Sequence, residues 1–267
     1  MSEARDVKSE SERRGEVHLD YRGDVAHVTF ARPKARNAMT FHMYGRLAEI
    51  CDELEAREDL KAIVFRGAEG TFVAGTDISE FTAFKSGRDG LDYEKRIDAT
   101  IARIESLPAP TLAVVEGAAV GGGLAMAAAC DIRITTPDAR FGVPIAQTLG
   151  NCLSAGNLAR LERVLGLAQA KALLLLSQMM DGERAYQIGF ASFLASREEI
   201  DGVVEKQLGK LTSAAPLTIA ASRALFLRLK ATPPEDADWI ERVYGSADFA
   251  EGVDAFLAKR KPAWKGR

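Results

Sequence analysis

The sequence predicts an α/β fold in which a sheet of mainly parallel strands is followed by a helical C-terminal annex. Three observations support this prediction. Short apolar and β-branched runs alternate with helical patterns over residues 16–135, which is the order of βα repeats. A glycine-rich turn leads into an alanine-rich helical pattern near residue 122. Beyond Gly156 the patterns are helical, with no convincing strand between them.

The elements follow from the spacing of apolar residues. Strands are expected where short runs alternate or are continuously apolar, at residues 16–22, 25–31, 62–66, 111–115 and 131–135. The first two flank Arg22-Gly23-Asp24, which resembles a hairpin turn. Helices are expected where apolar residues recur every three or four positions, at 40–55, 92–107, 158–165, 168–176, 185–188, 199–211, 216–229 and 235–258.

Composition restricts the classes of function. The chain has 267 residues, 47% of them hydrophobic and 27% charged, with a net charge of −3, so we expect a globular protein that does not bind nucleic acid. Three cysteines without metal-ligand spacing suggest reduced thiols, a cytoplasmic location and no metal site. No apolar run reaches the roughly 20 residues that span a bilayer, so we expect no membrane association.

The most informative segment is the run over residues 115–131, in which Gly121-Gly122-Gly123 opens a helix. Glycine permits close backbone approach, and the first turn of a helix offers unpaired N–H groups to an anion. A second glycine element, Ala74-Gly75-Thr76-Asp77, follows the strand expected at 62–66. If neighbouring βα loops converge, the N–H groups near Thr76 and Gly122 form an oxyanion hole.

Together these elements resemble the enoyl-CoA hydratase/isomerase family, also called the crotonase superfamily. The resemblance covers roughly residues 16–262. Besides the two glycine elements it includes Val28 to Met39, the segment Phe141-Gly142-Val143-Pro144 with Leu149-Gly150, and Phe256 to Pro262. It implies a crotonase-like ββα superhelix. We therefore expect a disordered tail at 1–14, the core at 15–200, and a helical oligomerisation or lid region at 201–267.

The resemblance also implies roles for individual residues. The backbone N–H groups of Thr76 and Gly122 would hold a thioester oxygen. The residues implied to contact CoA are Lys34, Ala35 and Arg36 at the nucleotide, Ala74, Asp77 and Ile78 along the adenine and pantetheine path, and Phe256 and Lys259, which in this family commonly reach the CoA of a neighbouring subunit. The implied partners are an acyl-CoA thioester and further copies of the chain, as a homotrimer or dimer of trimers. No cofactor is implied beyond the CoA of the substrate.

The chain departs from the family where the hydratases carry two glutamates. Ala125 and Ile145, or Ala146 in the other alignment, occupy those positions, so no carboxylate is supplied there. The polar groups expected near the acyl pocket are Gln147, Thr148, Asn151, Cys152 and Ser154. We expect Glu80, Asp92, Glu94 and Asp98 to be solvated charges on the pocket roof.

Three hypotheses follow from these residues. The first is an acyl-CoA enzyme that stabilises an enolate-like anion, with a reaction that differs from hydration. The second is a protein that binds acyl-CoA without catalysis. The third is a thioesterase or dehalogenase-like enzyme that uses Cys152, which stands where the dehalogenases of the family have an aspartate nucleophile.

Overall fold

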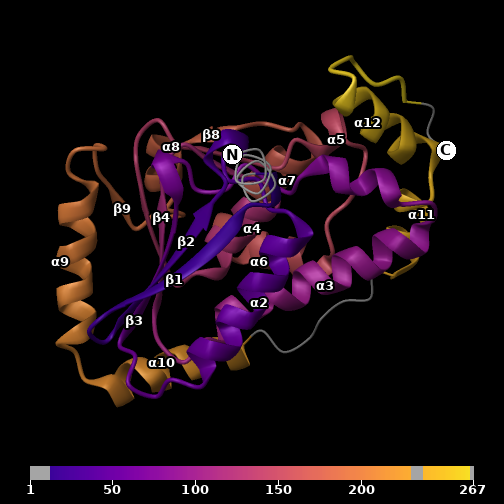
Figure 1. Ribbon diagram of the computed structural model, residues 1–267. Helices are drawn as coiled ribbons and strands as arrows, with labels where there is room; N and C mark the ends of the chain where they lie inside the picture. The colour runs from indigo at the N-terminus through magenta and orange to yellow at the C-terminus, as the bar shows by residue number, and fades with distance from the viewer. Residues whose placement is uncertain (1–12, 230–236, 265–267) are drawn as a thin grey trace, which may run out of the picture.

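The computed structural model describes residues 13–229 and 237–264, in which a six-stranded sheet has the order β1-β2-β3-β4-β6-β9 (Figure 1). β1 and β2 form the expected antiparallel hairpin, and every later neighbour pairs in parallel. The strands of this sheet are β1 (Glu16–Arg22), β2 (Val25–Ala31), β3 (Ala62–Gly67), β4 (Thr111–Val115), β6 (Ile132–Thr135) and β9 (Phe193–Leu194). The predicted mainly parallel α/β sheet is confirmed.

Both faces of this sheet are buried at β3 and β4, which explains why these two strands have nearly continuous apolar sequences. In β3, Ile63 and Phe65 point into the large core beneath α2, α3 and α4, whereas Ala62 and Val64 point to the opposite face. There α9 (Ile200–Thr212) covers the sheet with Ile200, Val204 and Leu208, as the helix beside the sheet in Figure 1 shows.

A second, three-stranded sheet carries the glycine-rich segment. It has the order β5-β7-β8 and consists of β5 (Ala118–Val120), β7 (Arg140–Gly142) and β8 (Met180–Asp181). β5 ends at Val120, and α4 (Gly122–Ala129) begins two residues later. All of the α4 side chains from Leu124 onward are buried, so this alanine-rich helix packs close to the sheet.

The helices agree with the predicted periodicity in most places. Their bounds are α2 (Phe41–Glu55), α3 (Gly87–Ser106), α5 (Ile145–Thr148), α6 (Ala155–Leu165), α7 (Leu167–Leu175), α8 (Gly182–Gln187), α10 (Pro216–Arg228), α11 (Ala237–Tyr244) and α12 (Ala247–Leu257), with 3-10 turns η1 (Pro33–Ala35), η2 (Ala68–Gly70) and η3 (Ile78–Ala83). α3 starts five residues before the predicted position because Ser86 and Asp89 form a capping box.

Two predictions about the second half are wrong. β8 and β9 lie beyond Gly156, where no strand is expected, and each has only two residues, too few to produce a periodic pattern. The single helix predicted over 235–258 is interrupted, because Ser246 caps α12 by accepting a hydrogen bond from the Phe249 N–H at 3.0 Å. The predicted tail at 1–14 falls mostly on residues 1–12, outside the described part.

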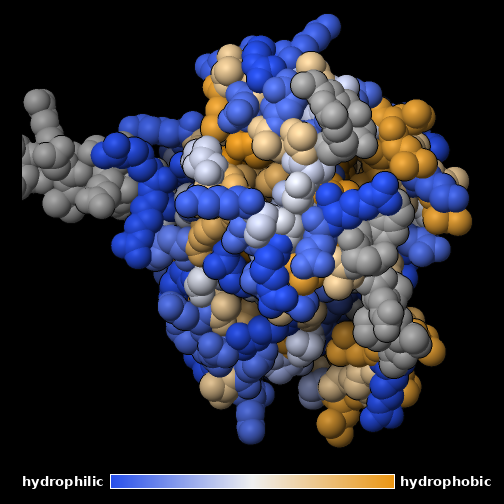
Figure 2. Space-filling view, turned by 90° about the vertical axis from the view of Figure 1, so that its right-hand side faces the viewer, coloured by the Kyte–Doolittle hydropathy of each residue, from blue (hydrophilic) through white to orange (hydrophobic). Residues whose placement is uncertain are grey.

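α10 lies at the lower edge of the molecule and exposes large apolar side chains. Leu217, Leu225, Phe226 and Leu229 are 83%, 58%, 68% and 82% exposed. Figure 2 shows hydrophobic residues gathered at the same low level of the molecule as α10 in Figure 1. A contiguous exposed apolar surface of this kind marks an interaction surface. Arg223 connects α10 to the core by an ion pair with Asp131 at 2.8 Å and by a hydrogen bond to the Glu105 carbonyl at 3.3 Å.

Candidate active site

A cavity of about 500 Å³ lies where segments far apart in the sequence meet. Its walls come from the loop 74–78, the start of α4, the middle of α3, the segment 144–153 and α12. The lining includes both glycine elements that the sequence singles out. The structure therefore brings together the segments whose convergence the oxyanion prediction requires.

The backbone of Thr76 forms a parallel bridge with Met39 that leaves the Thr76 N–H pointing away from Met39. Met39 donates to the Gly75 carbonyl and accepts from the Asp77 N–H, each at 2.8 Å. In this parallel bridge pattern, the residue between the two bonded ones directs its own N–H to the opposite side. The Thr76 N–H is thus directed away from Met39, and Thr76 lines the cavity.

Gly122 presents the second donor at the first position of α4. Gly121 has φ +53° and ψ −117°, a conformation that only glycine adopts readily, and its N–H is bonded to the Gly142 carbonyl at 2.9 Å. The first helical bond runs from the Ala125 N–H to the Gly121 carbonyl, so the Gly122 N–H has no intrahelical acceptor. A Cβ added at Gly122 would lie 3.6 Å from Thr76 Oγ1, which places the two segments side by side.

Beside these two residues, the hydroxyl groups of the half-buried Thr76 and the buried Tyr44 and Tyr93 form a chain of hydrogen bonds. Thr76 Oγ1 lies 3.0 Å from Tyr44 Oη and 2.9 Å from Tyr93 Oη. Burial raises the pKa of both tyrosines, so both phenols stay protonated at neutral pH. The chain fixes the Thr76 side chain and thereby the peptide that carries its N–H.

Basic residues line the exposed part of the cavity. Ala35 and Arg36 are in the lining, and Arg36 is exposed in a left-handed turn with φ +50°. Asn37 stabilises this turn by donating to the Ala68 and Thr71 carbonyls at 2.8 and 2.6 Å. Lys34 lies on the same 3-10 turn, exposed and outside the lining set. These cations suit a phosphate group at this end of the cavity.

Asp77 is part of the same wall and forms an ion pair with Arg32 at 2.7 Å. Burial opposes its ionisation, but hydrogen bonds from Ser79 and the Arg32 guanidinium lower the pKa of Asp77 overall. Ala74 and Ile78 on either side also line the cavity. Asp77 additionally starts the 3-10 turn η3 by accepting from the Ser79 N–H, so its charge serves local structure.

At the inner end, Ala125 and Ile145 line the cavity and provide no carboxylate. The expectation for Glu94 is wrong: this residue is 2% exposed and lines the cavity instead of being a solvated helix charge. Its Oε2 accepts from the Ser154 N–H at 2.9 Å, and its Oε1 accepts from Tyr244 Oη at 2.6 Å. The sequence contains a signal for this position, because Glu94 follows Leu91 and precedes Ile97 at helical spacing on the buried face of α3.

Of the five polar residues predicted near the acyl pocket, Thr148 and Asn151 line the cavity, whereas Gln147, Cys152 and Ser154 are outside the lining set. Asn151 lines the cavity and donates from Nδ2 to Tyr244 Oη at 3.2 Å. Gln147 is exposed and donates to the Leu176 carbonyl at 3.2 Å, outside the lining set. Cys152 is partly buried against the apolar core and also lies outside that set.

Of the two residues predicted from the C-terminal helix, one reaches the cavity. Phe256 lines it, although the side chain is 48% exposed. Lys259 is exposed just beyond α12, outside the lining set, with φ +53°. Phe256 thus borders the cavity of its own chain.

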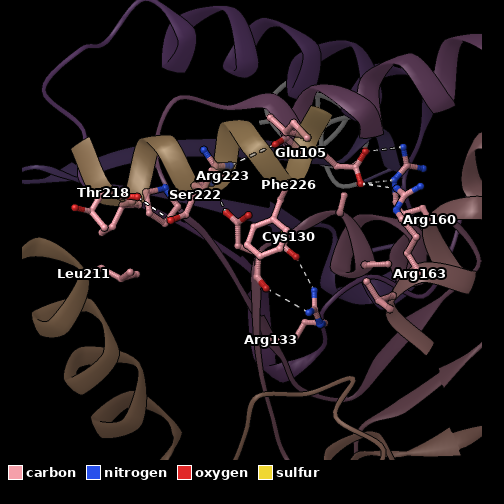
Figure 3. Close-up of a pocket in the computed structure, with 17 residues that line it drawn as sticks. Glu105, Cys130, Arg133, Arg160, Arg163, Leu211, Thr218, Ser222, Arg223 and Phe226 are labelled. Atoms are coloured by element: carbon pink, nitrogen blue, oxygen red, sulfur yellow. Dashed lines mark hydrogen bonds and ion pairs between the residues drawn. The ribbon is translucent and has the colours of Figure 1, made fainter. Parts of the chain in front are cut away.

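A second cavity of about 500 Å³ lies beneath α10 (Figure 3). Several of its charged side chains form ion pairs: Arg160 and Arg163 contact Glu105 at 3.2 and 3.3 Å, and Arg223 contacts Asp131 at 2.8 Å. The first two pairs connect α6 to α3, and the third connects α10 to the residue that precedes β6. Arg133 instead donates to backbone carbonyls, among them that of Ala127 at 3.2 Å. Thr76 and Gly122, whose N–H groups are expected to bind an oxyanion, line the first cavity and not this one.

Among the residues that the structure describes, no group of three or more His, Cys, Asp and Glu residues is arranged to hold a metal ion. No helix among the same residues is both long and apolar enough to cross a membrane.

Comparison with known proteins places this geometry in a family. The enoyl-CoA hydratase/isomerase family profile matches residues 20–267. A Bacillus subtilis (strain 168) protein named "Probable enoyl-CoA hydratase" is 34% identical over 250 residues, covering 91% of this chain and 95% of its own. The mitochondrial methylglutaconyl-CoA hydratase of Rattus norvegicus is 30% identical over 273 residues, covering 98% and 85%.

A solved structure agrees with the sequence relatives. Methylmalonyl-CoA decarboxylase in complex with 2-nitronate-propionyl-CoA superposes with a TM-score of 0.83 and 28% identity, over 94% of this chain and 98% of that one. The predicted crotonase-type fold is therefore confirmed, and the chain belongs to the enoyl-CoA hydratase/isomerase family.

Proposed function

We propose that this protein binds an acyl-CoA thioester in the cavity at Thr76 and Gly122 and stabilises the enolate-like anion formed from it. The observation that carries the proposal is the side-by-side placement of two backbone segments, each with an N–H that the fold leaves without a regular backbone acceptor. Two donors aimed at one oxygen stabilise negative charge, and removal of one typically costs about 2.7–4 kcal/mol of barrier.

The rest of the cavity supports a CoA thioester as the ligand. Arg36 and the neighbouring Lys34 are exposed cations beside the outer lining, which suits the phosphates of CoA. Phe256, Ile78 and Ile97 add apolar surface that suits a pantetheine or acyl chain. Relatives named as hydratases and a decarboxylase of CoA thioesters share this fold. No cofactor besides the substrate's own CoA is part of the proposal.

Ala125 and Ile145 favour proton chemistry other than standard hydration. Addition of water uses groups that orient it and move protons, each worth about 10²–10⁴-fold in rate. Neither position carries such a group. Cys152 is not the alternative nucleophile of this proposal, because its side chain lies outside the cavity lining.

The decisive experiment removes the Gly122 N–H while the shape of the site is kept. In a Tyr44→Phe background, which makes room for a Cβ, Gly122→Pro deletes the donor and Gly122→Ala retains it. Proline is tolerated at the first position of a helix. We expect the proline variant to lose about 10²–10³-fold in turnover of a short enoyl-CoA relative to the alanine variant. Equal turnover in the two folded variants would contradict the oxyanion assignment, and binding without turnover in the wild type would favour a non-catalytic acyl-CoA-binding protein.

We also propose that the chain works as a homotrimer or a dimer of trimers in the cytoplasm. The exposed apolar side chains of α10 support assembly, since Leu217 and Leu229 are more than four-fifths exposed in the single chain. All three cysteines are free, which agrees with a reducing compartment. Analytical ultracentrifugation tests the oligomeric state, and a monomer at micromolar concentration would contradict it.

A further inference from the structure

We infer that Glu94 is the catalytic carboxylate of this site and that it transfers the proton at Cα of the bound thioester. The inference rests on the proposed function and adds the acid–base group that Ala125 and Ile145 lack. Among the described lining residues the carboxylates are Asp77, which is paired with Arg32, and Glu94, which is 2% exposed at the inner end. Glu94 belongs to neither position where the family's hydratases carry glutamate.

Glu94 lines the same cavity as the oxyanion residues Thr76 and Gly122. Tyr93 and Ile97 border the same cavity from the same helix, so this turn of α3 forms part of the wall. Tyr93, one residue earlier, places its hydroxyl 2.9 Å from Thr76 Oγ1. The residue next to Glu94 on α3 is therefore hydrogen-bonded to the residue that carries the Thr76 N–H, and both Glu94 and Thr76 line the same cavity.

Ser154 and Tyr244 are among the groups that hold the carboxylate in place, and both are neutral donors. The Ser154 N–H donates to Oε2 at 2.9 Å, and the Tyr244 hydroxyl donates to Oε1 at 2.6 Å. Asn151 Nδ2 donates in turn to Tyr244 Oη at 3.2 Å, which orients the phenol proton toward Glu94. Burial and the adjacent Glu94 charge raise the pKa of Tyr244, so the phenol keeps the proton that it donates.

A buried carboxylate is costly unless it has partners, and such groups concentrate at functional sites. A single carboxylate is sufficient for a double-bond shift. Glu94 takes a proton from Cα of a 3-enoyl thioester, and the C–H electron pair moves onto the thioester oxygen held by Thr76 and Gly122. The carboxylic acid then returns that proton to Cγ, the carbonyl re-forms, and the double bond lies between Cα and Cβ. Glu94 ends as the carboxylate, and no water or oxidant is consumed.

The test compares the wild type with Glu94→Gln, Tyr244→Phe and a control, Asp92→Asn. Asp92 is an exposed carboxylate two residues away on the same helix and forms an ion pair with Arg88 at 3.2 Å. Three quantities are measured: exchange of the α-protons of butyryl-CoA in deuterium oxide by mass spectrometry, conversion of 3-hexenoyl-CoA to its conjugated isomer, and butyryl-CoA affinity by calorimetry. Exchange reports on proton removal without depending on the final product.

We expect Glu94→Gln to lose about 10²–10⁴-fold in exchange and isomerisation while it still binds butyryl-CoA. The control should match the wild type. Tyr244→Phe removes a donor to the ionised carboxylate, so the acidic limb of its pH–rate profile should move to higher pH. A purely structural role for Tyr244 would lower activity without that displacement.

The outcomes separate this inference from the proposed function. Wild-type exchange that persists in Glu94→Gln overturns the role of Glu94 and leaves the oxyanion proposal standing. A wild type that binds butyryl-CoA but neither exchanges its protons nor shifts the double bond overturns both. If Glu94→Gln does not fold, Tyr244→Phe decides: a displaced acidic limb supports the inference, and an unchanged one overturns it.

Discussion

The Tyr44 hydroxyl leaves no room for a side chain at Gly122, so we expect Gly122→Ala to destabilise the protein and Tyr44→Phe to reverse most of that loss. A Cβ added at Gly122 would lie 2.4 Å from Tyr44 Oη, about 1 Å short of the 3.4 Å of an ordinary contact. Tyr44 is fully buried and cannot swing away, so we expect Gly122→Ala to destabilise the protein by about 1–3 kcal/mol, as overpacking does elsewhere. That corresponds to roughly 2–4 °C in Tm per kcal/mol in a chain of this size.

Removal of the Tyr44 hydroxyl should reverse most of this loss. Once Tyr44→Phe has removed the hydroxyl, the atoms nearest to a Cβ at position 122 are Thr76 Oγ1 and the ring Cζ of residue 44. They lie at 3.6 and 3.7 Å, which are ordinary contact distances. Tyr44→Phe alone should cost about 0.5–1.5 kcal/mol, because the hydrogen bond to Thr76 is lost. The two substitutions together should therefore be less destabilising than their sum, with a coupling of about 1–2 kcal/mol.

Urea unfolding of the wild type, the two single variants and the double variant measures this coupling. Gly202→Ala in α9 is the matched control, since a Cβ there meets no atom within 4 Å and should stabilise by about 0.4–1 kcal/mol. Strict additivity of the two substitutions would refute the proposed contact. It would mean that the chain accommodates the new methyl group by moving α4 rather than by pressing on the phenol.

Four further outcomes can be measured. The Asp77→Asn variant should have a lower free energy of unfolding than the wild type at pH 6. The difference should vanish as pH falls through the lowered pKa of Asp77, because the paired carboxylate stabilises the fold only while it is ionised. A difference in the free energy of unfolding that persists at low pH contradicts this. Replacement of Lys34 and Arg36 by alanine should weaken CoA-thioester binding and its salt dependence with little change in kcat, and an unchanged salt slope in calorimetry argues against phosphate contact. Cys152→Ser should keep wild-type turnover in the enoyl-CoA assay, whereas a large loss would restore the thiol hypothesis. Phe226→Lys on α10 should shift the sedimentation coefficient to that of a monomer, and an unchanged oligomer would place the interface elsewhere.

The sequence predicts that the Thr76 and Gly122 segments converge, and the structure places them side by side. Glycine at 121 is needed for its positive φ, and the helix that follows exposes an N–H at Gly122 whatever the rest of the chain does. Convergence with Thr76 follows from the parallel order of the strands, which periodicity also predicts. The glycine turn and the helix start depend on short stretches of chain, whereas the convergence depends on the strand order.

The burial of Glu94 depends on packing against α11, which is distant in the sequence, so the pattern of α3 alone does not predict it. Glu94 becomes buried because α11 packs against α3, and that contact exists only because Gly87 and Gly90 present no side chains: a Cβ at either would lie 1.9 Å from an atom of α11. A carboxylate on the apolar stripe between Leu91 and Ile97 is the available signal. Two-residue strands such as β8 escape prediction for a different reason, since they contain less than one period.

The bond between Tyr244 and Glu94 joins positions 150 residues apart. A growing chain emerges from the ribosome N-terminus first, so the carboxylate, the two N–H donors and most of the sheet are made long before the phenol that orients the acid–base group. Nascent chains that stop before α11 would carry a cavity able to hold a thioester but no oriented carboxylate. Competence for proton transfer would thus arise as one of the last events of synthesis, when α11 docks on the two glycines of α3.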